Sequence, residues 1–147
     1  MKYKKTIVIV SVLMIFVLLI SQCHSSHFYK VNNITFTVWK KTWSSVYITP
    51  YKYNGLFHPK QDYIETSACD FITICLENDS SLIIFNSGYE ANRFIKCNFT
   101  NYKYKLFMNK NETVEDVDNY YKNREKSMNK YPFFDIYIKE MTVYTSK

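Results

Sequence analysis

Glycine is scarce in this sequence, with Gly55 and Gly88 the two glycines among 147 residues. Loops that bind phosphate groups or dinucleotides need several closely spaced glycines, so this scarcity excludes both motifs. The sequence also lacks the HExxH and GxSxG patterns of zinc proteases and serine hydrolases. We therefore expect no enzyme and no cofactor, and we keep a secreted enzyme or toxin with a dispersed site as the last alternative.

A strong excess of one charge is missing as well. The formal net charge of +6 includes Lys2, Lys4 and Lys5 near the N-terminus, which leaves +3 for the rest of the chain. Such a mild positive charge does not predict nucleic-acid binding. A Cys-His-x2-His run begins at Cys23, but it straddles the end of the leader described next and lacks further ligands, so we expect no metal site.

One long hydrophobic run occurs, from Thr6 to Ile20. Lysines precede it and small or polar residues follow it, which is the layout of a secretory signal peptide. The run is shorter than the roughly 20 residues that a helix needs to cross a bilayer. We expect residues 1–23 to be the signal peptide, with cleavage after one of residues 23 to 25, Cys23 and Ser25 both being suitable. The mature chain would then be secreted or lumenal in the endoplasmic reticulum, and an uncleaved N-terminal anchor is the alternative.

Residues 24–147 are enough for one domain with a single core. No second apolar run follows, so we expect no C-terminal anchor. Four Asn-x-Ser/Thr sequons support an oxidising, glycosylating route, in which a glycan holds each modified residue at the surface. The candidate glycosylation sites are Asn33, Asn78, Asn98 and Asn111.

Short β-rich segments with period-two alternation dominate the mature chain and predict an all-β sandwich. The segment from Pro50 to Lys60 contains two prolines and Gly55, which predicts an irregular connection. The expected strands are Ile34–Trp39, Ser44–Thr49, Asp70–Leu76, Leu82–Asn86, Arg93–Phe99, Tyr102–Met108, Phe133–Ile138 and Met141–Tyr144.

One helix is expected to interrupt the strands. Thr113 and Asp116 resemble a capping box, with Asp in place of Glu. Acidic residues fill the first turns and basic residues the later ones, up to Lys126, which suits the helix dipole. Val114, Val117 and Tyr121 offer an apolar stripe, so we expect the helix to pack across an edge of the sandwich.

The cysteines cannot all pair with one another. Cys69 and Cys75 are six residues apart on one expected strand, so their Cα atoms would lie roughly 20 Å apart. A disulfide needs about 7 Å or less, and Cys97 can therefore pair with Cys69 or with Cys75 but not with both. The remaining thiol could pair with a retained Cys23, bridge two chains or stay free. We favour a bridge between two chains or a buried free thiol.

Two blocks of residues occur in a recognisable order. The first contains Cys-x5-Cys from Cys69 to Cys75, then Leu82-Ile83-Ile84, then a strand ending near Cys97 to Phe99. The second is Lys-Tyr-Pro-Phe-Phe-Asp-Ile at 130–136, followed by Met-Thr-Val-Tyr-Thr-Ser-Lys at 141–147. Together, over residues 69–147, they resemble the CR1-type domain of the adenovirus E3 membrane glycoproteins.

This resemblance implies a glycosylated immunoglobulin-like β-sandwich that binds host immune proteins, because members of that group intercept MHC class I molecules or engage leukocyte receptors. The sequence departs from the family at Ile136 and Tyr137, where a late cysteine is usual, and it lacks the family's C-terminal transmembrane helix. An ordinary variable domain is disfavoured because Trp39 and Trp43 both precede the first mature-chain cysteine.

The expected function is therefore that of a secreted or lumenal viral glycoprotein that modulates host immunity by binding an immune receptor or MHC class I. The alternative is a viral membrane or virion structural glycoprotein held by an uncleaved N-terminal segment. A disulfide-linked dimer is a further possible assembly. Tyr131, Phe133 and Phe134 are the partner-binding candidates, although we favour a core strand for this aromatic run.

Overall fold

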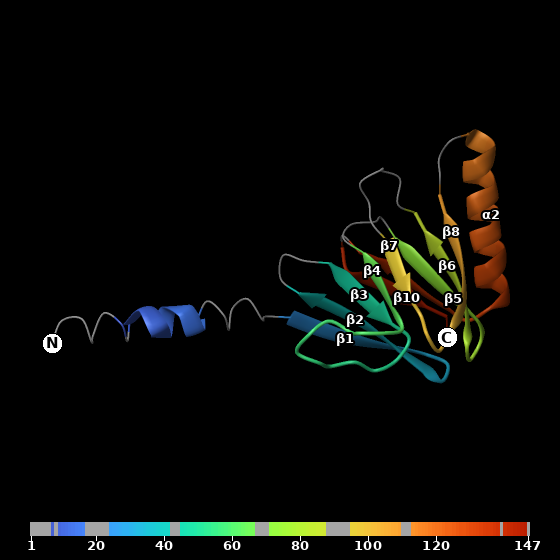
Figure 1. The fold of residues 1–147 in the computed structure, drawn as a ribbon. Helices are drawn as coiled ribbons and strands as arrows, with labels where there is room; N and C mark the ends of the chain where they lie inside the picture. Colours follow the sequence, from blue (N-terminus) through green and yellow to red (C-terminus); the bar gives the residue numbers. More distant parts are fainter. Residues whose placement is uncertain are drawn as a thin grey trace.

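The computed structural model describes residues 7, 9–16, 24–41, 45–66, 71–87, 95–109, 113–138 and 140–146. Residues 9–16 are helical, and the elements that follow form a separate folded body (Figure 1). Among the described residues, no helix has the length and apolar character needed to cross a membrane. The strands and the long helix are β1 (His24–Val31), β2 (Ile34–Lys41), β3 (Val46–Thr49), β4 (Tyr63–Thr66), β5 (Ile72–Asn78), β6 (Ser81–Asn86), β7 (Ile95–Asn98), β8 (Lys103–Met108), α2 (Val114–Lys130), β9 (Phe133–Tyr137) and β10 (Thr142–Thr145).

The strands form two five-stranded sheets packed face to face. Sheet A has the order β1-β2-β3-β4-β7, and all of its neighbours are antiparallel. Sheet B has the order β10-β9-β5-β6-β8, and β8 runs parallel to β6. This parallel pair differs from the antiparallel sheets of an immunoglobulin domain. The all-β sandwich that the sequence predicts is confirmed, and the one short helix expected beside it is α2, which has 17 residues.

The main core lies between the two sheets, because alternate residues of each strand point inward. In β2, for example, Phe36 and Val38 are fully buried in this core, while Trp39 belongs to a separate cluster. The buried residues of the main core are Val31, Phe36, Val38, Val46, Ile48, Ile64, Ile72, Ile74, Leu76, Leu82, Ile84, Phe134, Ile136 and Ile138.

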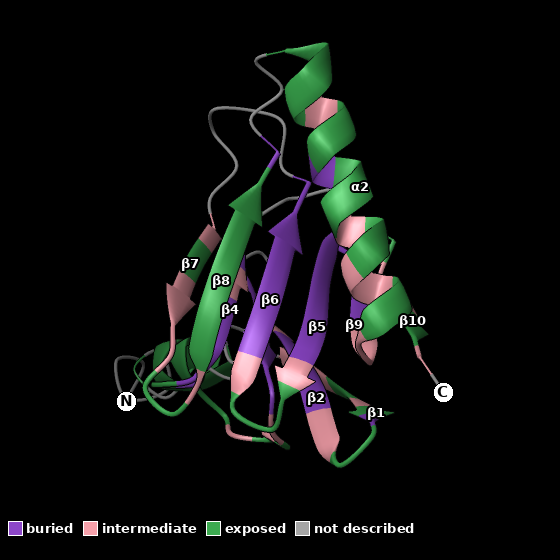
Figure 2. Cartoon of the chain, turned by 90° about the vertical axis from the view of Figure 1, so that its right-hand side faces the viewer, coloured by how far each residue is buried: buried purple, intermediate pink, exposed green. Residues whose placement is uncertain are grey.

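Helix α2 covers the outer face of sheet B (Figure 2). Its N-cap is Thr113, whose side chain accepts a hydrogen bond from the backbone of Asp116, as the sequence predicts. The buried contact with the sheet is made by Tyr120, which packs near Cys75 and Phe85. The predicted apolar stripe is wrong for Val114, which is 81% exposed, while Tyr121 is 44% exposed and keeps a ring contact with Phe71 at 6.4 Å between ring centres.

A buried polar network fixes the same helix to the sheet. Arg124 donates from Nε to Thr73 Oγ1 at 2.7 Å and from Nη2 to Asp135 Oδ2 at 2.8 Å. Thr73 and Asp135 are direct partners on β5 and β9, and the threonine hydroxyl donates to Asp135 Oδ1 at 2.6 Å. The Arg124 guanidinium also lies 4.4 Å from the ring centre of Phe71. The helix is therefore held in one position by directional bonds.

The outer face of sheet A is covered by the connection between β3 and β4. Trp39, Tyr47 and Tyr63 form a buried aromatic cluster on this face, with Tyr53 of the connection packed against it. The predicted irregular segment from Pro50 to Lys60 is confirmed, and it is the green trace that folds beside the first strands (Figure 1). Both sheets thus bury apolar residues on their outer faces as well as in the main core.

Candidate binding surfaces

Hydrogen bonds to sheet A give the connection 50–60 a defined conformation. The Trp39 indole donates from Nε1 to the carbonyl of Gly55 at 3.1 Å, and the backbone N–H of Tyr53 donates to Thr37 Oγ1 at 2.9 Å. Within the loop, Tyr53 Oη donates to the carbonyl of Phe57 at 2.6 Å. A Cβ at Gly55 would collide with the Tyr53 ring, so any other residue here would displace that ring from its place in the loop.

Two large apolar side chains project from this ordered loop. Leu56 and Phe57 are each 68% exposed, although the carbonyl of Gly55 is bonded to Trp39 of the sheet and the carbonyl of Phe57 is bonded to Tyr53 of the loop. Phe28 of β1 is 45% exposed, and Lys52 of the loop places its Nζ 5.4 Å from the centre of that ring. We call these four residues the loop surface. Adjacent exposed apolar residues on a rigid scaffold are typical of a binding surface.

The phenols beneath the loop surface are neutral at physiological pH. Burial raises the pKa of Tyr47, and its hydrogen bond to Glu65 Oε1, 2.8 Å long, raises it further. Burial also raises the pKa of Tyr51, with the charge of Asp62 acting in the same direction. The Tyr47 ring stacks on His58 with ring centres 5.3 Å apart. These contacts support the loop without adding ionised phenolates to it.

The predicted aromatic contact patch is not an exposed surface. Phe134 is fully buried in the main core and stacks on Phe36, with ring centres 4.8 Å apart. Phe133 and Tyr131 are half-buried and pack against the cluster beneath α2. The partner-binding assignment is therefore wrong for Phe134, because strand β9 turns this side chain into the sandwich, as the favoured core interpretation expects.

The structure separates the two cysteines that it describes. Cys75 is a fully buried free thiol on the outer face of sheet B, and Cys97 is a free thiol on β7 of sheet A, packed against the main core. A Cys75–Cys97 disulfide is therefore wrong, because the two side chains lie on opposite sides of sheet B. Cys69, the remaining disulfide candidate, falls outside the described residues, as does Cys23.

The sequons have different surroundings. Asn33 and Asn78 are exposed in the tight turns of the β1–β2 and β5–β6 hairpins. The backbone N–H of Ser80 donates to Asn78 Oδ1 at 3.0 Å, which closes the turn. Asn98 is half-buried, and its Nδ2 donates to the carbonyl of Lys60 at 3.1 Å. Asn111 lies outside the described residues.

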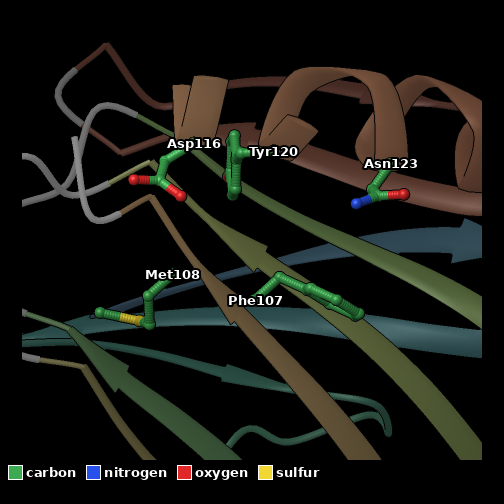
Figure 3. A pocket seen from close by; sticks show the side chains of 5 residues that line it. All are labelled: Phe107, Met108, Asp116, Tyr120 and Asn123. Carbon is green, nitrogen blue, oxygen red and sulfur yellow. The ribbon is translucent and has the colours of Figure 1, made fainter. Parts of the chain in front are cut away.

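A small pocket of about 160 Å³ lies between α2 and the end of β8 (Figure 3). Asp116, Tyr120 and Asn123 line it from the helix, while Phe107 and Met108 line it from the strand. Its walls are apolar and aromatic with one carboxylate, and its volume suits a single side chain. Among the described residues, no group of three or more potential metal-ligating side chains is found.

Comparisons with known proteins provide no family assignment. No family model, curated protein or solved structure matches the chain. The loop surface was not predicted from the sequence, in which Leu56 and Phe57 fall in a segment predicted only to be irregular. Two adjacent large apolar residues between Pro50 and Pro59 are the signal that could have indicated it.

Proposed function

We propose that this protein is a secreted or lumenal viral glycoprotein that binds a host immune protein through its loop surface. The observation that carries this proposal is the exposure of Leu56 and Phe57 on a loop that hydrogen bonds hold in place. An ordered loop loses little conformational entropy on binding, so the apolar area it buries contributes directly to affinity. Lys52 and Lys60 are exposed in the same connection as the apolar pair and favour a partner with acidic residues at its rim.

The resemblance of residues 69–147 to the CR1-type domain supports the choice of partner class. It favours MHC class I molecules and leukocyte receptors as the proteins to test first. The loop surface belongs to residues 24–68, which have no counterpart in that resemblance. The proposed contact would therefore be a property of this chain rather than one that it shares with the CR1-type group.

Binding to leukocytes tests the proposal. The glycoprotein secreted from mammalian cells is labelled and titrated onto leukocytes by flow cytometry, and onto purified MHC class I by a surface binding assay. We expect saturable binding to one of these targets. Leu56→Ser and Phe57→Ser should each weaken it at least about tenfold, since buried apolar anchors dominate interface energies.

Val114→Ser is the matched control, because Val114 is 81% exposed and lies on α2 rather than in the loop. This variant should bind like the unaltered protein. Equal binding by the loop variants and the unaltered protein, with circular dichroism showing all of them folded, contradicts the use of this surface. An absence of saturable binding to leukocytes and to MHC class I contradicts the immune function itself.

The alternative function is that of a viral membrane or virion structural glycoprotein with an uncleaved N-terminal segment. The observation that favours it is the helical conformation of residues 9–16, which expose apolar side chains to solvent on the isolated chain. N-terminal sequencing of the mature protein separates the two functions. A first residue between 24 and 26 supports the secreted form, whereas retention of residue 1 supports the anchored form.

A further inference from the structure

Strand β8 forms an edge of sheet B, and among the described residues no other strand pairs with its outer side. It is the last strand in the order β10-β9-β5-β6-β8, and all six of its residues are exposed, unlike those of the buried neighbour β6 (Figure 2). The large apolar residues on it, with 38–43% exposure, are Tyr104, Leu106, Phe107 and Met108. An exposed apolar edge presents unpaired backbone groups and is a template for another strand.

The side chains of β8 divide between two faces. Leu106 pairs with Ile84 of the main core, whereas Phe107 pairs with Phe85, which belongs to the cluster beneath α2. Because side chains alternate along a strand, Lys105 shares the helix side with Phe107. By the same alternation Tyr104 and Leu106 lie on the core side, while Met108, at the end of the strand opposite Asn86, also lines the pocket beneath α2.

A second copy of β8 complements this pattern if the two strands pair antiparallel about a two-fold axis at Leu106. Leu106 then lies opposite its own copy, and Tyr104 lies opposite Met108 of the other copy. On the helix side, Lys105 lies opposite the other copy's Phe107. This register gives apolar pairs on one face and cation–aromatic pairs on the other, and it places no lysine directly opposite another.

The pocket beneath α2 lies on the same face as Phe107 and provides charge complementarity. Phe107 forms part of its apolar wall and Asp116 supplies a carboxylate (Figure 3), so the pocket suits the stem and the ammonium group of a lysine. Thr113 donates to one oxygen of that carboxylate, Oδ2, at 2.7 Å, and the incoming lysine would use Oδ1. The Lys105 side chain is 63% exposed, and its 3.5 Å ion pair with Glu77 is a weak surface contact that can exchange.

We propose that the chain forms a homodimer by antiparallel β8–β8 pairing centred on Leu106, with Lys105 of each copy in the pocket of the other. Pairing about a two-fold axis uses the β8 edge of each copy, so this contact joins two copies and no more. Cys75 and Cys97 cannot link the copies, because both thiols face the interior of their own chain. Hydrogen bonds, apolar contacts and the Lys105–Asp116 pair would hold this dimer together.

Sedimentation of the glycosylated, secreted protein tests the dimer. We expect the unaltered protein to sediment as a dimer at micromolar concentration. Leu106→Lys and Leu106→Glu each place two like charges on the axis and should give monomers. An equimolar mixture of these two variants should restore the dimer, because opposite charges then meet. Tyr144→Lys on β10, the other edge of sheet B, alters a residue that is 57% exposed and should leave the dimer intact.

Crosslinking tests the register without depending on charge. In the proposed pairing the two Cα atoms of residue 106 lie about 5 Å apart, so Leu106→Cys should form a disulfide-linked dimer on mild oxidation. The Cα atoms of residue 103 would lie roughly 20 Å apart, so Lys103→Cys should not. Monomeric sedimentation of the unaltered protein overturns the proposal, and so does equal crosslinking of both variants. A mixture of the two charged variants that stays monomeric while both are folded also overturns it.

Discussion

The two described thiols differ in position but share one chemical property. Burial raises the pKa of Cys75 to about 12, against the opposing effect of Arg124, and burial raises the pKa of Cys97 to about 11. At pH 8 less than about one thiol in a hundred is ionised in either case, and the thiolate is the reactive form. Both cysteines are therefore protected from oxidation and exchange while the chain stays folded.

We accordingly predict that iodoacetamide at pH 8 labels neither Cys75 nor Cys97 in the folded protein. In denaturant both should be labelled, because unfolding removes the burial that raises the two pKa values. Peptide mass spectrometry measures the labelling at each site. Labelling of Cys97 in the folded protein would contradict its place against the core. If iodoacetamide fails to label Cys97 in denaturant without reductant, Cys97 forms a disulfide.

Asp62 is a second residue whose surroundings decide its charge. Burial alone would raise the pKa of this carboxyl, but hydrogen bonds from the backbone N–H groups of Thr100 and Asn101, and from the Asn101 side chain, lower it overall. The residue is 3% exposed and adopts a positive φ of 53°. Its ionised form therefore ties the start of β4 to the turn after β7.

We predict that Asp62→Asn lowers the free energy of unfolding by about 1–3 kcal/mol at pH 7, because the amide loses the charge-assisted bonds. Asparagine tolerates positive φ, so backbone strain does not confound the comparison. A carboxyl with a lowered pKa stabilises the fold above its unfolded pKa, and that stability is lost as pH falls through the folded pKa. The difference in free energy of unfolding between the unaltered protein and Asp62→Asn, measured by denaturant titration, should therefore shrink below about pH 4. A difference that stays constant from pH 7 to pH 3 contradicts this role.

At the scale of elements, the one cation in the buried network, Arg124, contributes much of the attachment of α2 to sheet B. The Arg124 and Asp135 side chains are 17% and 5% exposed, so their ion pair is largely shielded from solvent. Removing the cation leaves the Asp135 carboxylate buried without its charged partner, which costs more than the lost hydrogen bonds alone. The helix has one buried apolar residue, Tyr120, so the network supplies much of its specific docking.

We predict that Arg124→Ala lowers the free energy of unfolding by about 3–5 kcal/mol, measured by chemical denaturation. Lys122→Ala, an exposed change on the same helix, should alter it by less than about 0.5 kcal/mol. Adding Asp135→Ala to Arg124→Ala should recover part of the loss, because the uncompensated charge is removed as well. Additive losses in this double-mutant cycle would show that the two residues act independently.

The elements that sequence reasoning predicted are those with a clear alternation or a strong cap. The β5–β6 hairpin and the N-terminus of α2 are of this kind, and both are confirmed. Strand β1 was not predicted because Val31 is its one buried residue, and its position depends on pairing with β2 rather than on side-chain burial. The inward face of β5 was also unpredictable, because both faces of this strand are buried.

The loop surface could not be predicted from the sequence, for a different reason. The conformation of the loop depends on Trp39 and Thr37, which contact it from β2 across more than ten residues of sequence. Local patterns therefore indicated an irregular segment and could not show that Leu56 and Phe57 are held outward. The same limit applies to Phe133 and Phe134, since the register of β9 decides which of the two is buried.

For the whole molecule, the two exposed sequons lie at one end of the sandwich. The β1–β2 turn with Asn33 and the β5–β6 turn with Asn78 are found at the same end in both views (Figures 1 and 2). A glycan at either turn extends into solvent without displacing a packed residue. Asn98 differs, because the nitrogen that would carry its glycan already donates to Lys60 from a half-buried position.

We predict that the protein secreted from mammalian cells is glycosylated almost fully at Asn33 and Asn78 and at a much lower level at Asn98. Mass spectrometry of peptides treated with a peptide N-glycosidase in heavy-oxygen water measures the occupancy of each site, because this enzyme converts each glycan-bearing asparagine to aspartate and adds one oxygen from the water. As a control, Asn33→Gln should remove one glycan and leave secretion unchanged, because this side chain is exposed in a turn. Asn98→Gln should instead lower the melting temperature, since it breaks the bond between β7 and the loop at Lys60. High occupancy at Asn98 with an unchanged melting temperature in Asn98→Gln would contradict a structural role for this amide.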